Sequence, residues 1–231
     1  MIGEIVIEEL LPVAVMATEC RQDIGDWPLY PEEEEVASRA APARRKEFTT
    51  VRACARDALA KLGLSPAPIL PGPLGAPIWP AGVVGSMTHC AGYRAAAVAR
   101  ASEICSVGVD AEPNEPLPPD VLDSVAGEGE RAWIAGLLAT RPDVSWDRLL
   151  FSAKESVFKT WFPLTRRWLD FGQAAITVDP AARTFSARLT ASAMPLADPP
   201  LTGFSGRWLA RDGLVLTAIT VSRAQYPARV P

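Results

Sequence analysis

Two lysines and a glutamate lie within one short stretch of the chain, at Lys154, Glu155 and Lys159. At 100° per residue on a helix, Lys154 falls inside the apolar stripe of this stretch, Glu155 at its edge, and Lys159 one turn further on. A lysine on a buried helix face is costly unless an opposite charge meets it there. The alternative is a snorkelling lysine, with its stem packed and its ammonium in water. The helix alone favours neither interpretation.

A helix is predicted here because apolar side chains recur every three to four residues through residues 150–162. Leu150, Val157 and Trp161 form one stripe, which two phenylalanines widen. Pro163 is expected to end the helix, since proline lacks the N–H and clashes with the preceding turn. The stretch is therefore predicted to be an amphipathic helix with its charged residues at the border of a thick apolar face.

Two carboxylates follow a predicted strand, in the sequence Gly108-Val-Asp-Ala-Glu112. Side chains at i and i+2 of a strand point to the same face, so Asp110 and Glu112 are expected side by side. A cation between them would relieve their repulsion, and Mg²⁺ typically takes one or two carboxylates together with substrate phosphates. The alternative is a pair of solvent-facing acids at the end of a strand.

The single histidine of the chain, His89, lies in a small polar cluster, Gly85-Ser-Met-Thr-His-Cys90. A segment dense in proline and glycine, residues 65–85, precedes it and is predicted to be a binding loop. The hydroxyls of Ser86 and Thr88 suit phosphate oxygens. The alternative for a lone histidine is a packed structural residue.

Residues 44–62 form a second predicted helix, and its cationic side chains make a stripe beside its apolar face. Six basic and two acidic side chains between residues 44 and 61 leave a local charge of +4 in an acidic protein. A solvated charged face explains such a stripe, and an anionic ligand explains it more sharply. The basic residues are Arg44, Arg45, Lys46, Arg52, Arg56 and Lys61.

Length and composition bound the function. The chain has 231 residues, enough for one substantial core or two compact halves, and its formal charge of −4 excludes a generally basic nucleic-acid binder. One histidine excludes a site built from several histidine ligands. The four cysteines are scattered without a Cys-x-x-Cys pair, which argues against structural zinc and a disulfide framework. The N-terminal stretch lacks a basic region, so neither a signal peptide nor a membrane span is predicted, and a cytoplasmic protein is expected.

The remaining elements are predicted from pattern and turn chemistry. Short strands broken at Pro12 are expected in residues 4–16. A helix is expected to start at Pro31, where an acidic run meets the positive end of the dipole, and two short helices in residues 118–138. Strands are predicted over residues 93–100, 104–109, 174–178, 184–189, 206–210 and 214–221, with Asp179-Pro180 and Asp212-Gly213 as hairpin turns.

Taken together, three motifs resemble the signature of the 4′-phosphopantetheinyl transferase superfamily, in its larger monomeric class and its actinobacterial branch. They are the loop leading to Gly85-Ser-Met-Thr-His89, the strand Gly108-Val-Asp-Ala-Glu112, and Phe151-x-x-Lys154-Glu155-x-x-x-Lys159. The order and separation of the motifs carry the resemblance, which covers residues 44–162. No sequence repeat independent of the family is visible.

The resemblance implies an α+β fold: two similar α/β halves, residues 1–108 and 109–231, related by a pseudo-twofold, with the active site in the cleft between them. It implies a monomeric enzyme that moves the 4′-phosphopantetheine arm of coenzyme A to a serine of an acyl or peptidyl carrier protein and releases 3′,5′-ADP. Neither nucleic acid nor membrane is an expected partner.

The resemblance also implies roles for single residues. Asp110, Glu112 and Glu155 would hold Mg²⁺, and Glu155 or a metal-bound water would take the proton from the carrier serine. Lys154 would point into the cleft and stabilise charge on the phosphates, so Glu155, Lys154 and Asp110 form the expected catalytic set. Coenzyme A would be bound by Arg44, Arg52, Ser86, Met87, Thr88, His89, Lys154 and Lys159.

Two features depart from the family pattern. Phe151 stands where many relatives carry tryptophan, and Pro71 and Leu74 occupy the loop region where relatives often place a lysine. Two rival functions remain at this point. One is a Mg²⁺-dependent pyrophosphate hydrolase acting on coenzyme A or nucleotides, and the other is a coenzyme A or carrier-binding protein without catalysis.

Overall fold

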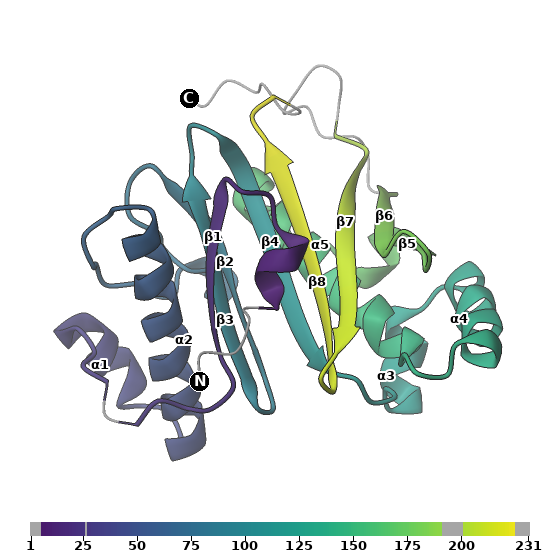
Figure 1. The fold of residues 1–231 in the computed structure, drawn as a ribbon, viewed down its shortest axis with the longest axis horizontal. Coiled ribbons are helices and arrows are strands. Elements are labelled where there is room, and N and C mark those ends of the chain that lie inside the picture. Colours follow the sequence, from purple (N-terminus) through teal and green to yellow (C-terminus); the bar gives the residue numbers. More distant parts are fainter. Residues whose placement is uncertain (1–5, 26, 191–200, 225–231) are drawn as a thin grey trace.

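The computed structural model describes residues 6–25, 27–190 and 201–224, which form two antiparallel sheets with helices packed against them (Figure 1). The first sheet has the order β1-β3-β2 and the second the order β4-β8-β7-β6-β5. The expected mixed α+β class is confirmed, with two sheets and five α-helices among these described residues. Within the described residues, no helix is both long and apolar enough to cross a membrane.

The N-terminal half consists of β1 (Val15–Cys20), β2 (Val83–Cys90) and β3 (Tyr93–Arg100), with α1 (Pro31–Ala37) and α2 (Pro42–Lys61). α2 is twenty residues long and packs on the sheet. Alanines dominate β3, and this small side chain lets α2 lie close to one face while a second apolar cluster forms on the other.

The C-terminal half holds another helix of twenty residues, α5 (Trp146–Thr165), on one face of the five-stranded sheet. Its strands are β4 (Ile104–Pro113), β5 (Ala174–Asp179), β6 (Thr184–Leu189), β7 (Gly203–Arg211) and β8 (Leu214–Ser222). Figure 1 shows α5 behind this sheet and the 3₁₀ helix η1 (Ile7–Leu10) in front of it. The helices α3 (Pro119–Val125) and α4 (Glu128–Thr140) lie at the right of the view, away from the N-terminal sheet. Two further short 3₁₀ helices are η2 (Pro73–Gly75) and η3 (Phe171–Gln173).

Side-chain hydroxyls join the two sheets where β2 lies beside β4. Ser86 Oγ accepts a hydrogen bond from the Val109 amide at 3.1 Å, and Thr88 Oγ1 accepts one from the Ala111 amide at 3.0 Å. Both hydroxyls are buried. β4 pairs with β8 along one of its edges. The bonds to Ser86 and Thr88 satisfy amides along the other edge, which faces β2. The polar cluster around His89 is therefore a strand at the junction of the halves.

A glycine allows α5 to lie against β4. A Cβ on Gly108 would overlap the carbonyl oxygen of Ser156 and the hydroxyl of Thr160, both on α5. Ser106, two residues earlier on the same strand, donates from its hydroxyl to the Thr160 carbonyl at 2.9 Å. The glycine of the motif Gly108-Val-Asp-Ala-Glu112 is thus required by helix–strand contact, and it brings the acids that follow close to α5.

Two expectations need correction. α5 passes through Pro163 and ends at Thr165, with Arg166 in the left-handed region at φ 56° and its amide bonded to the Phe162 carbonyl. A proline in a helix removes the one hydrogen bond that its own N–H would donate to the carbonyl four residues earlier, and here the helix continues for only two residues beyond it. Residues 7–10 form η1 instead of a strand, and β1 starts only at Val15.

The predicted division of the chain between residues 108 and 109 falls within a strand. β4 runs across this point from Ile104 to Pro113 and pairs with β8 along its length, so the strand as a whole belongs to the C-terminal sheet. The division into two halves stays a prediction. The predicted helices starting near residues 31, 44 and 118 and the predicted strands from residue 93 onward are confirmed.

Candidate functional site

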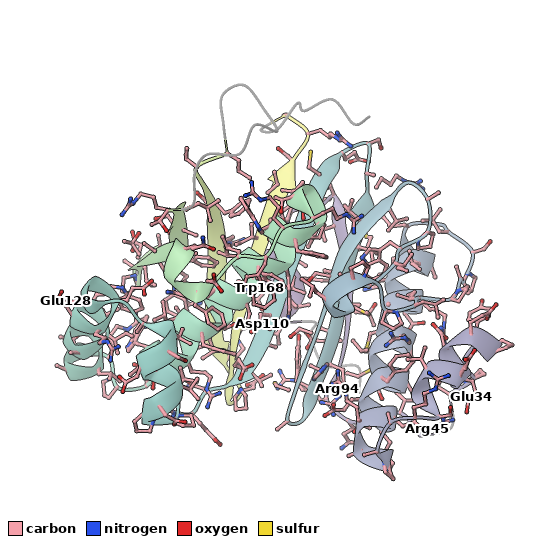
Figure 2. The ribbon with its side chains drawn as sticks, turned by 180° about the vertical axis from the view of Figure 1, so that it is seen from behind. Glu34, Arg45, Arg94, Asp110, Glu128 and Trp168 are labelled. Carbon is pink, nitrogen blue, oxygen red and sulfur yellow. The ribbon has the colours of Figure 1, made fainter. Side chains whose placement is uncertain are left out.

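A cavity of about 590 Å³ lies in the cleft between the halves. α2, the proline-rich loop and β2 line it from the N-terminal half, and the start of β4 and the C-terminal part of α5 line it from the other. Figure 2 shows Asp110 and Trp168 near the middle of the molecule, while Glu34 and Arg45 lie at the outer edge. Seven of the predicted site residues line this cavity: Arg44, Arg52, Ser86, Met87, His89, Glu155 and Lys159.

The cavity is strongly cationic although the protein is acidic. Arg44, Arg52, Lys159 and Arg166 line it, and Glu155 is the only lining residue with a carboxylate among those described. The other cations of the α2 stripe point elsewhere. Arg45 pairs with Glu34 at 2.6 Å, Arg56 with Glu33 at 2.8 Å and Lys61 with Glu8 at 2.8 Å. Only part of the basic stripe predicted from the sequence therefore lines the cavity.

Arg52 forms a buried wall of the cavity. Its Nε donates to the Ile69 carbonyl at 2.9 Å, and its guanidinium carbon lies 3.1 Å from the ring centroid of Phe48. Burial lowers the pKa of Arg52 to about 10, although Glu33 opposes this shift. The side chain stays cationic at neutral pH, so it offers a fixed positive charge with little freedom to reorient.

His89 and Arg44 form a hydrogen-bonded pair on the same wall of the cavity. Arg44 Nη1 donates to His89 Nε2 at 2.5 Å and to a carboxylate oxygen of Glu47 at 3.0 Å. Burial and the positive charge of Arg44 lower the pKa of His89, so the ring accepts this bond in its neutral form. Burial would raise the pKa of Glu47, but the hydrogen bond from Arg44 and the nearby cations hold it below its usual value.

In the C-terminal half, the side chain of Asp110 connects β4 to α5. Its Oδ1 accepts hydrogen bonds from Lys159 Nζ at 2.7 Å and from Thr88 Oγ1 at 3.2 Å. In the described part of the chain, Oδ2 of Asp110 is buried and has no hydrogen-bond partner. A buried carboxylate oxygen without a partner is costly, and a cation is the partner that carboxylates in such positions commonly take.

Glu112 lies on the same face of β4, as strand alternation predicted. Its Oε2 accepts a hydrogen bond from Arg148 Nη1 of α5 at 3.1 Å. Burial and the charge of Asp110 raise the pKa of Glu112 to about 7, against the lowering effect of Arg148. The charge of Asp110 therefore disfavours ionisation of Glu112.

Glu155 lines the cavity from α5, between Lys159 one turn further along and the two acids of β4. Burial raises the pKa of Glu155, Lys159 lowers it and Asp110 raises it again. A half-buried carboxylate with a raised pKa accepts a proton more readily than an ordinary glutamate. Glu155 is thus a carboxylate on the cavity wall whose raised pKa favours proton acceptance.

The expected direction of Lys154 is wrong. Its ammonium points away from the cavity, into the C-terminal half, where it donates to Glu130 Oε2 at 2.8 Å and to the carbonyls of Val125 at 2.7 Å and Phe171 at 3.0 Å. These three acceptors use all three donors of an ammonium group. Burial lowers the pKa of Lys154, opposed by Glu130. The lysine of α5 that faces the site is Lys159.

Thr88 also differs from the expectation that it lines a nucleotide pocket. It is buried between β2 and β4, where its hydroxyl serves both Asp110 and the Ala111 amide. Residues that the sequence analysis missed line the cavity with apolar surface: Phe48, Ile78, Trp79, Phe158 and Phe162. The aromatic residues of α5 were visible in the helical pattern, but periodicity does not tell a cavity wall from a core.

The donor set fits a hard divalent cation in chemistry. Asp110, Glu112 and Glu155 carry the carboxylate oxygens that such cations prefer, and Oδ2 of Asp110 has no hydrogen-bond partner among the described residues. Across the described ranges, three His, Cys, Asp or Glu side chains do not gather closely enough to form a complete metal site. Lys159 and Arg148 instead neutralise two of the acids.

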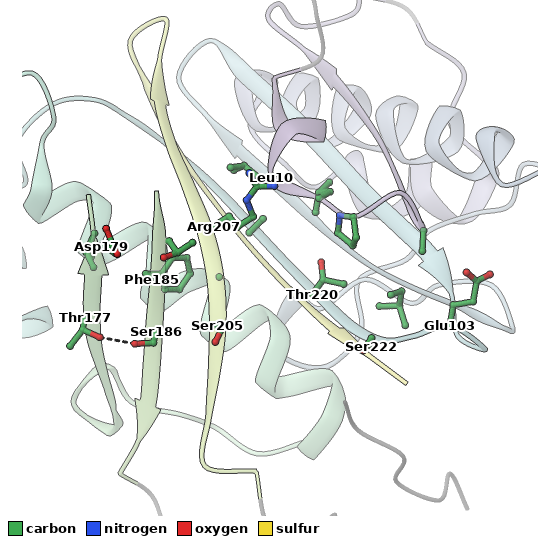
Figure 3. Close-up of a pocket in the computed structure, with 18 residues that line it drawn as sticks. Leu10, Glu103, Thr177, Asp179, Phe185, Ser186, Ser205, Arg207, Thr220 and Ser222 are labelled. Atoms are coloured by element: carbon green, nitrogen blue, oxygen red, sulfur yellow. Dashed lines mark hydrogen bonds between the residues drawn. The ribbon is translucent and has the colours of Figure 1, made fainter. Parts of the chain in front are cut away.

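A larger cavity, of about 1030 Å³, lies on the outer face of the five-stranded sheet (Figure 3). It is lined by η1, β5, β6 and β7, and Thr177 and Ser186 share a hydrogen bond of 2.6 Å across its floor. It contains none of the predicted site residues. The smaller cavity in the cleft is the candidate site, because Arg44, Arg52, His89, Glu155 and Lys159 all line it, and Lys159 in turn binds Asp110.

Comparison with known proteins agrees with this geometry. Residues 32–99 match the 4′-phosphopantetheinyl transferase N-terminal domain, and residues 106–197 match the 4′-phosphopantetheinyl transferase superfamily. The chain is 57% identical over 219 residues to 4′-phosphopantetheinyl transferase Svp of Streptomyces mobaraensis, covering 94% of this chain and 89% of that protein.

Two further relatives carry the same description. 4′-Phosphopantetheinyl transferase PptT of Mycobacterium tuberculosis is 49% identical over 83% of this chain and 85% of its own. 4′-Phosphopantetheinyl transferase Npt of Nocardia iowensis is 46% identical over 92% of this chain and 98% of its own. The resemblance to the actinobacterial branch is confirmed by these three. The chain belongs to the 4′-phosphopantetheinyl transferase superfamily.

Proposed function

We propose that the protein transfers the 4′-phosphopantetheine arm of coenzyme A to a serine hydroxyl of a carrier protein and releases 3′,5′-ADP. One observation carries the proposal: a single cavity in which Arg44, Arg52 and His89 of the N-terminal half face Glu155 and Lys159 of the C-terminal half. A ligand with several phosphates on one side and a reacting phosphorus on the other suits this division. The names of the relatives support the same reaction.

In this proposal the N-terminal wall binds the nucleotide end of coenzyme A. Arg44, Arg52 and His89 supply charge-assisted hydrogen bonds to phosphate oxygens. Ser86 and Met87 line the same wall. The loop has no lysine where relatives often place one, because Pro71 and Leu74 occupy that region. Arg166 is a further cation on the cavity wall, in addition to Arg44, Arg52 and Lys159. A bound phosphate would draw Arg44 away from His89 and favour protonation of the ring.

The C-terminal wall performs the chemistry. Asp110, Glu112 and Glu155 would hold Mg²⁺, which supplies neutralisation of the pyrophosphate charge. Glu155 is positioned to take the proton from the attacking serine, and Lys159 to stabilise charge on the transferred phosphate. Lys159 thereby takes the role that the sequence analysis gave to Lys154. The bond that forms joins the serine oxygen to phosphorus, and the pyrophosphate bond breaks.

The carrier is proposed to dock at the exposed end of α5. Acyl and peptidyl carriers present an acidic helix beside the modified serine, as the family resemblance implies. Arg166 lines the cavity, Arg167 is exposed, and Trp168 is 61% exposed beside Phe158, with ring centroids 5.1 Å apart. The expected monomeric state and cytoplasmic location stay predictions.

Intact-mass measurement of several apo carriers tests the proposal. Carriers from fatty-acid, polyketide and peptide synthases are incubated with the enzyme, coenzyme A and Mg²⁺. The expected result is a mass increase equal to one phosphopantetheine group, with 3′,5′-ADP formed in equal amount. Release of free phosphopantetheine without a carrier would favour a hydrolase, and coenzyme A binding without either product would favour a binding protein.

A further inference from the structure

Each half of the protein contains one fully buried carboxylate near the start of a short helix. Glu33 on α1 is 0% exposed and Glu130 on α4 is 7% exposed. Each occupies the third helical position and accepts a hydrogen bond from the amide three residues earlier. For Glu33 this is the Tyr30 amide at 3.1 Å, and for Glu130 the Gly127 amide at 2.8 Å.

Each carboxylate also binds a cation from the long helix of its own half. Arg56 of α2 donates to both oxygens of Glu33, at 3.0 and 2.8 Å, and Lys154 of α5 donates to Glu130 at 2.8 Å. The same cation reaches the carbonyl five residues before the glutamate. Arg56 donates to the Pro28 carbonyl at 3.0 Å, and Lys154 to the Val125 carbonyl at 2.7 Å.

A third bond connects each carboxylate to a more distant segment. Glu33 Oε1 accepts from the Ile69 amide at 2.8 Å, and Glu130 Oε1 accepts from the Ile176 amide at 2.8 Å. Ile69 precedes the loop that lines the site cavity, and Ile176 lies on β5. The amide, cation and carbonyl partners repeat one for one in the two halves, although the sequences show no visible repeat.

These two clusters fix the two helices that carry the opposite walls of the cleft. α2 carries Arg44 and Arg52, and the carbonyl of Ile69 accepts the hydrogen bond from Arg52 Nε. Glu33 holds the amide of the same residue. Lys154, which Glu130 holds, is the direct neighbour of Glu155 on α5. Each glutamate therefore acts on the site through one residue that it binds.

We propose that Glu33 and Glu130 are positioning residues with separate effects. Glu33 sets the wall that binds the phosphates of coenzyme A, and Glu130 sets the rotation of α5 that aims Glu155 and Lys159 at the reacting phosphorus. The assignment of the effects rests on the proposed function of the two walls. Lys154 belongs to the motif because it is the partner of Glu130.

Replacement of either glutamate by glutamine breaks part of its cluster. A glutamine side chain keeps one acceptor oxygen and turns the other into an NH₂ donor, which faces an amide or a cation that also donates. It also leaves the partner cation without its charge partner. Exposed neighbours supply matched controls: Glu34 lies next to Glu33, and Glu128 lies two residues from Glu130 (Figure 2).

The experiment compares Glu33→Gln, Glu130→Gln, Glu34→Gln and Glu128→Gln. For each variant, kcat and KM are measured in the carrier-modification assay, the Kd for coenzyme A by calorimetry without a carrier, and Tm by circular dichroism. Glu33→Gln is expected to raise the KM and Kd for coenzyme A about tenfold, with kcat little changed. This factor corresponds to the loss of one charge-assisted contact between Arg52 and a phosphate of coenzyme A. Glu130→Gln is expected to lower kcat about tenfold with Kd little changed. The two controls should match wild type.

A purely structural role predicts a different result. Both variants would then change kcat and Kd together, in proportion to their loss of Tm, or would change neither, and the proposal would be wrong. If a single variant does not fold, the paired variants Glu33→Gln/Arg56→Gln and Glu130→Gln/Lys154→Gln remove both charges and should show the same separation of Kd from kcat. A wild-type enzyme that modifies no carrier would refute the proposed function instead, while its calorimetry would still test Glu33.

Discussion

The ammonium of Lys159 on α5 lies 2.7 Å from Oδ1 of Asp110 on β4. The same lysine donates to the Val109 carbonyl at 3.2 Å, so it fixes the helix to the strand that carries the acids. Asp110 is 4% exposed and keeps its second oxygen free among the described residues. One oxygen of the carboxylate is therefore held by Lys159 and Thr88, while the other is buried without a hydrogen-bond partner among the described residues.

Asp110→Asn is expected to reduce carrier modification at least about a hundredfold, since it removes the buried negative charge and one oxygen ligand with almost no change in shape. The rate should no longer respond to Mg²⁺ in the range that stimulates wild type. The measurement is the initial rate of carrier modification against Mg²⁺ concentration, with the exposed Asp143→Asn as control. Normal stimulation of the variant by Mg²⁺ would show that Asp110 has only a structural role.

Strand alternation and helical periodicity were enough to place several site residues. Asp110 and Glu112 face the same side because the pleat requires it, and Glu155 and Lys159 follow at one-turn spacing on α5. The sequence also placed Lys154 in the buried stripe, where pairing with an opposite charge was one of two alternatives. That charge is Glu130, which precedes Lys154 by 24 positions. A helical wheel gives the burial of a side chain but not the segment that meets it, so the cleft and the interior could not be distinguished.

Glu33 illustrates the same limit in the N-terminal half. An acidic run at the start of a helix is explained by the helix dipole alone, and the sequence contains no reason to single out one of four glutamates. The structure buries this one because its partners Arg56 and Ile69 come from two other segments. Long-range polar contacts of this kind leave no periodic signal, whereas the apolar faces that build α2, α5 and the strands do.

Gly108→Ala is expected to destabilise the protein by about 1–3 kcal/mol, the range for overpacking a tight contact. The added methyl group would meet Ser156 and Thr160 on α5, and relief would require the helix to move away from β4. The rate of carrier modification should fall by more than the loss of folded protein explains, because this shift also separates Lys159 from Asp110. Urea unfolding and the rate of carrier modification measure the two effects.

Gly129→Ala is the matched control for this substitution. Gly129 is an exposed residue of α4 with open space at its Cβ position, and alanine is favoured over glycine in a helix by up to about 1 kcal/mol. This variant should be as active as wild type and slightly more stable. Equal stability of the Gly108→Ala and Gly129→Ala proteins would contradict the close approach of α5 to β4.

The raised pKa of Glu112, about 7, predicts a pH dependence of stability in the absence of divalent cations. Its usual value is 4.5, so the folded protein holds this proton more tightly than the unfolded chain. The resulting contribution to stability is complete below pH 4.5 and is lost as the pH rises through about 7. Glu112→Gln should remove this part of the pH dependence, which is measured as the difference in Tm between the two proteins from pH 5 to pH 8. A constant difference across that range would place the pKa of Glu112 outside it.

The last prediction concerns the carrier. The protein is acidic overall, so attraction of an acidic helix has to come from a local patch, and Arg166, Arg167 and Trp168 form one at the end of α5. Reversal of both arginines to glutamate is expected to raise the KM for the carrier about tenfold or more. The difference in carrier KM between this variant and wild type should become smaller as salt is added, because exposed charges are screened beyond roughly 10 Å at 0.1 M ionic strength.

The control is a second double reversal that changes the net charge by the same amount at a surface away from the cleft. Arg183 and Arg188 are exposed on the β5–β6 side of the molecule, and their reversal should leave the carrier KM unchanged. Arg166 lines the cavity, so the KM for coenzyme A is followed in both double variants and in Arg167→Glu alone. A carrier KM that rises with salt in wild type and less in Arg166→Glu/Arg167→Glu supports charge-driven docking at this end of α5. A carrier KM that responds neither to salt nor to the reversal would mean that the exposed Trp168 and its apolar neighbours dominate docking.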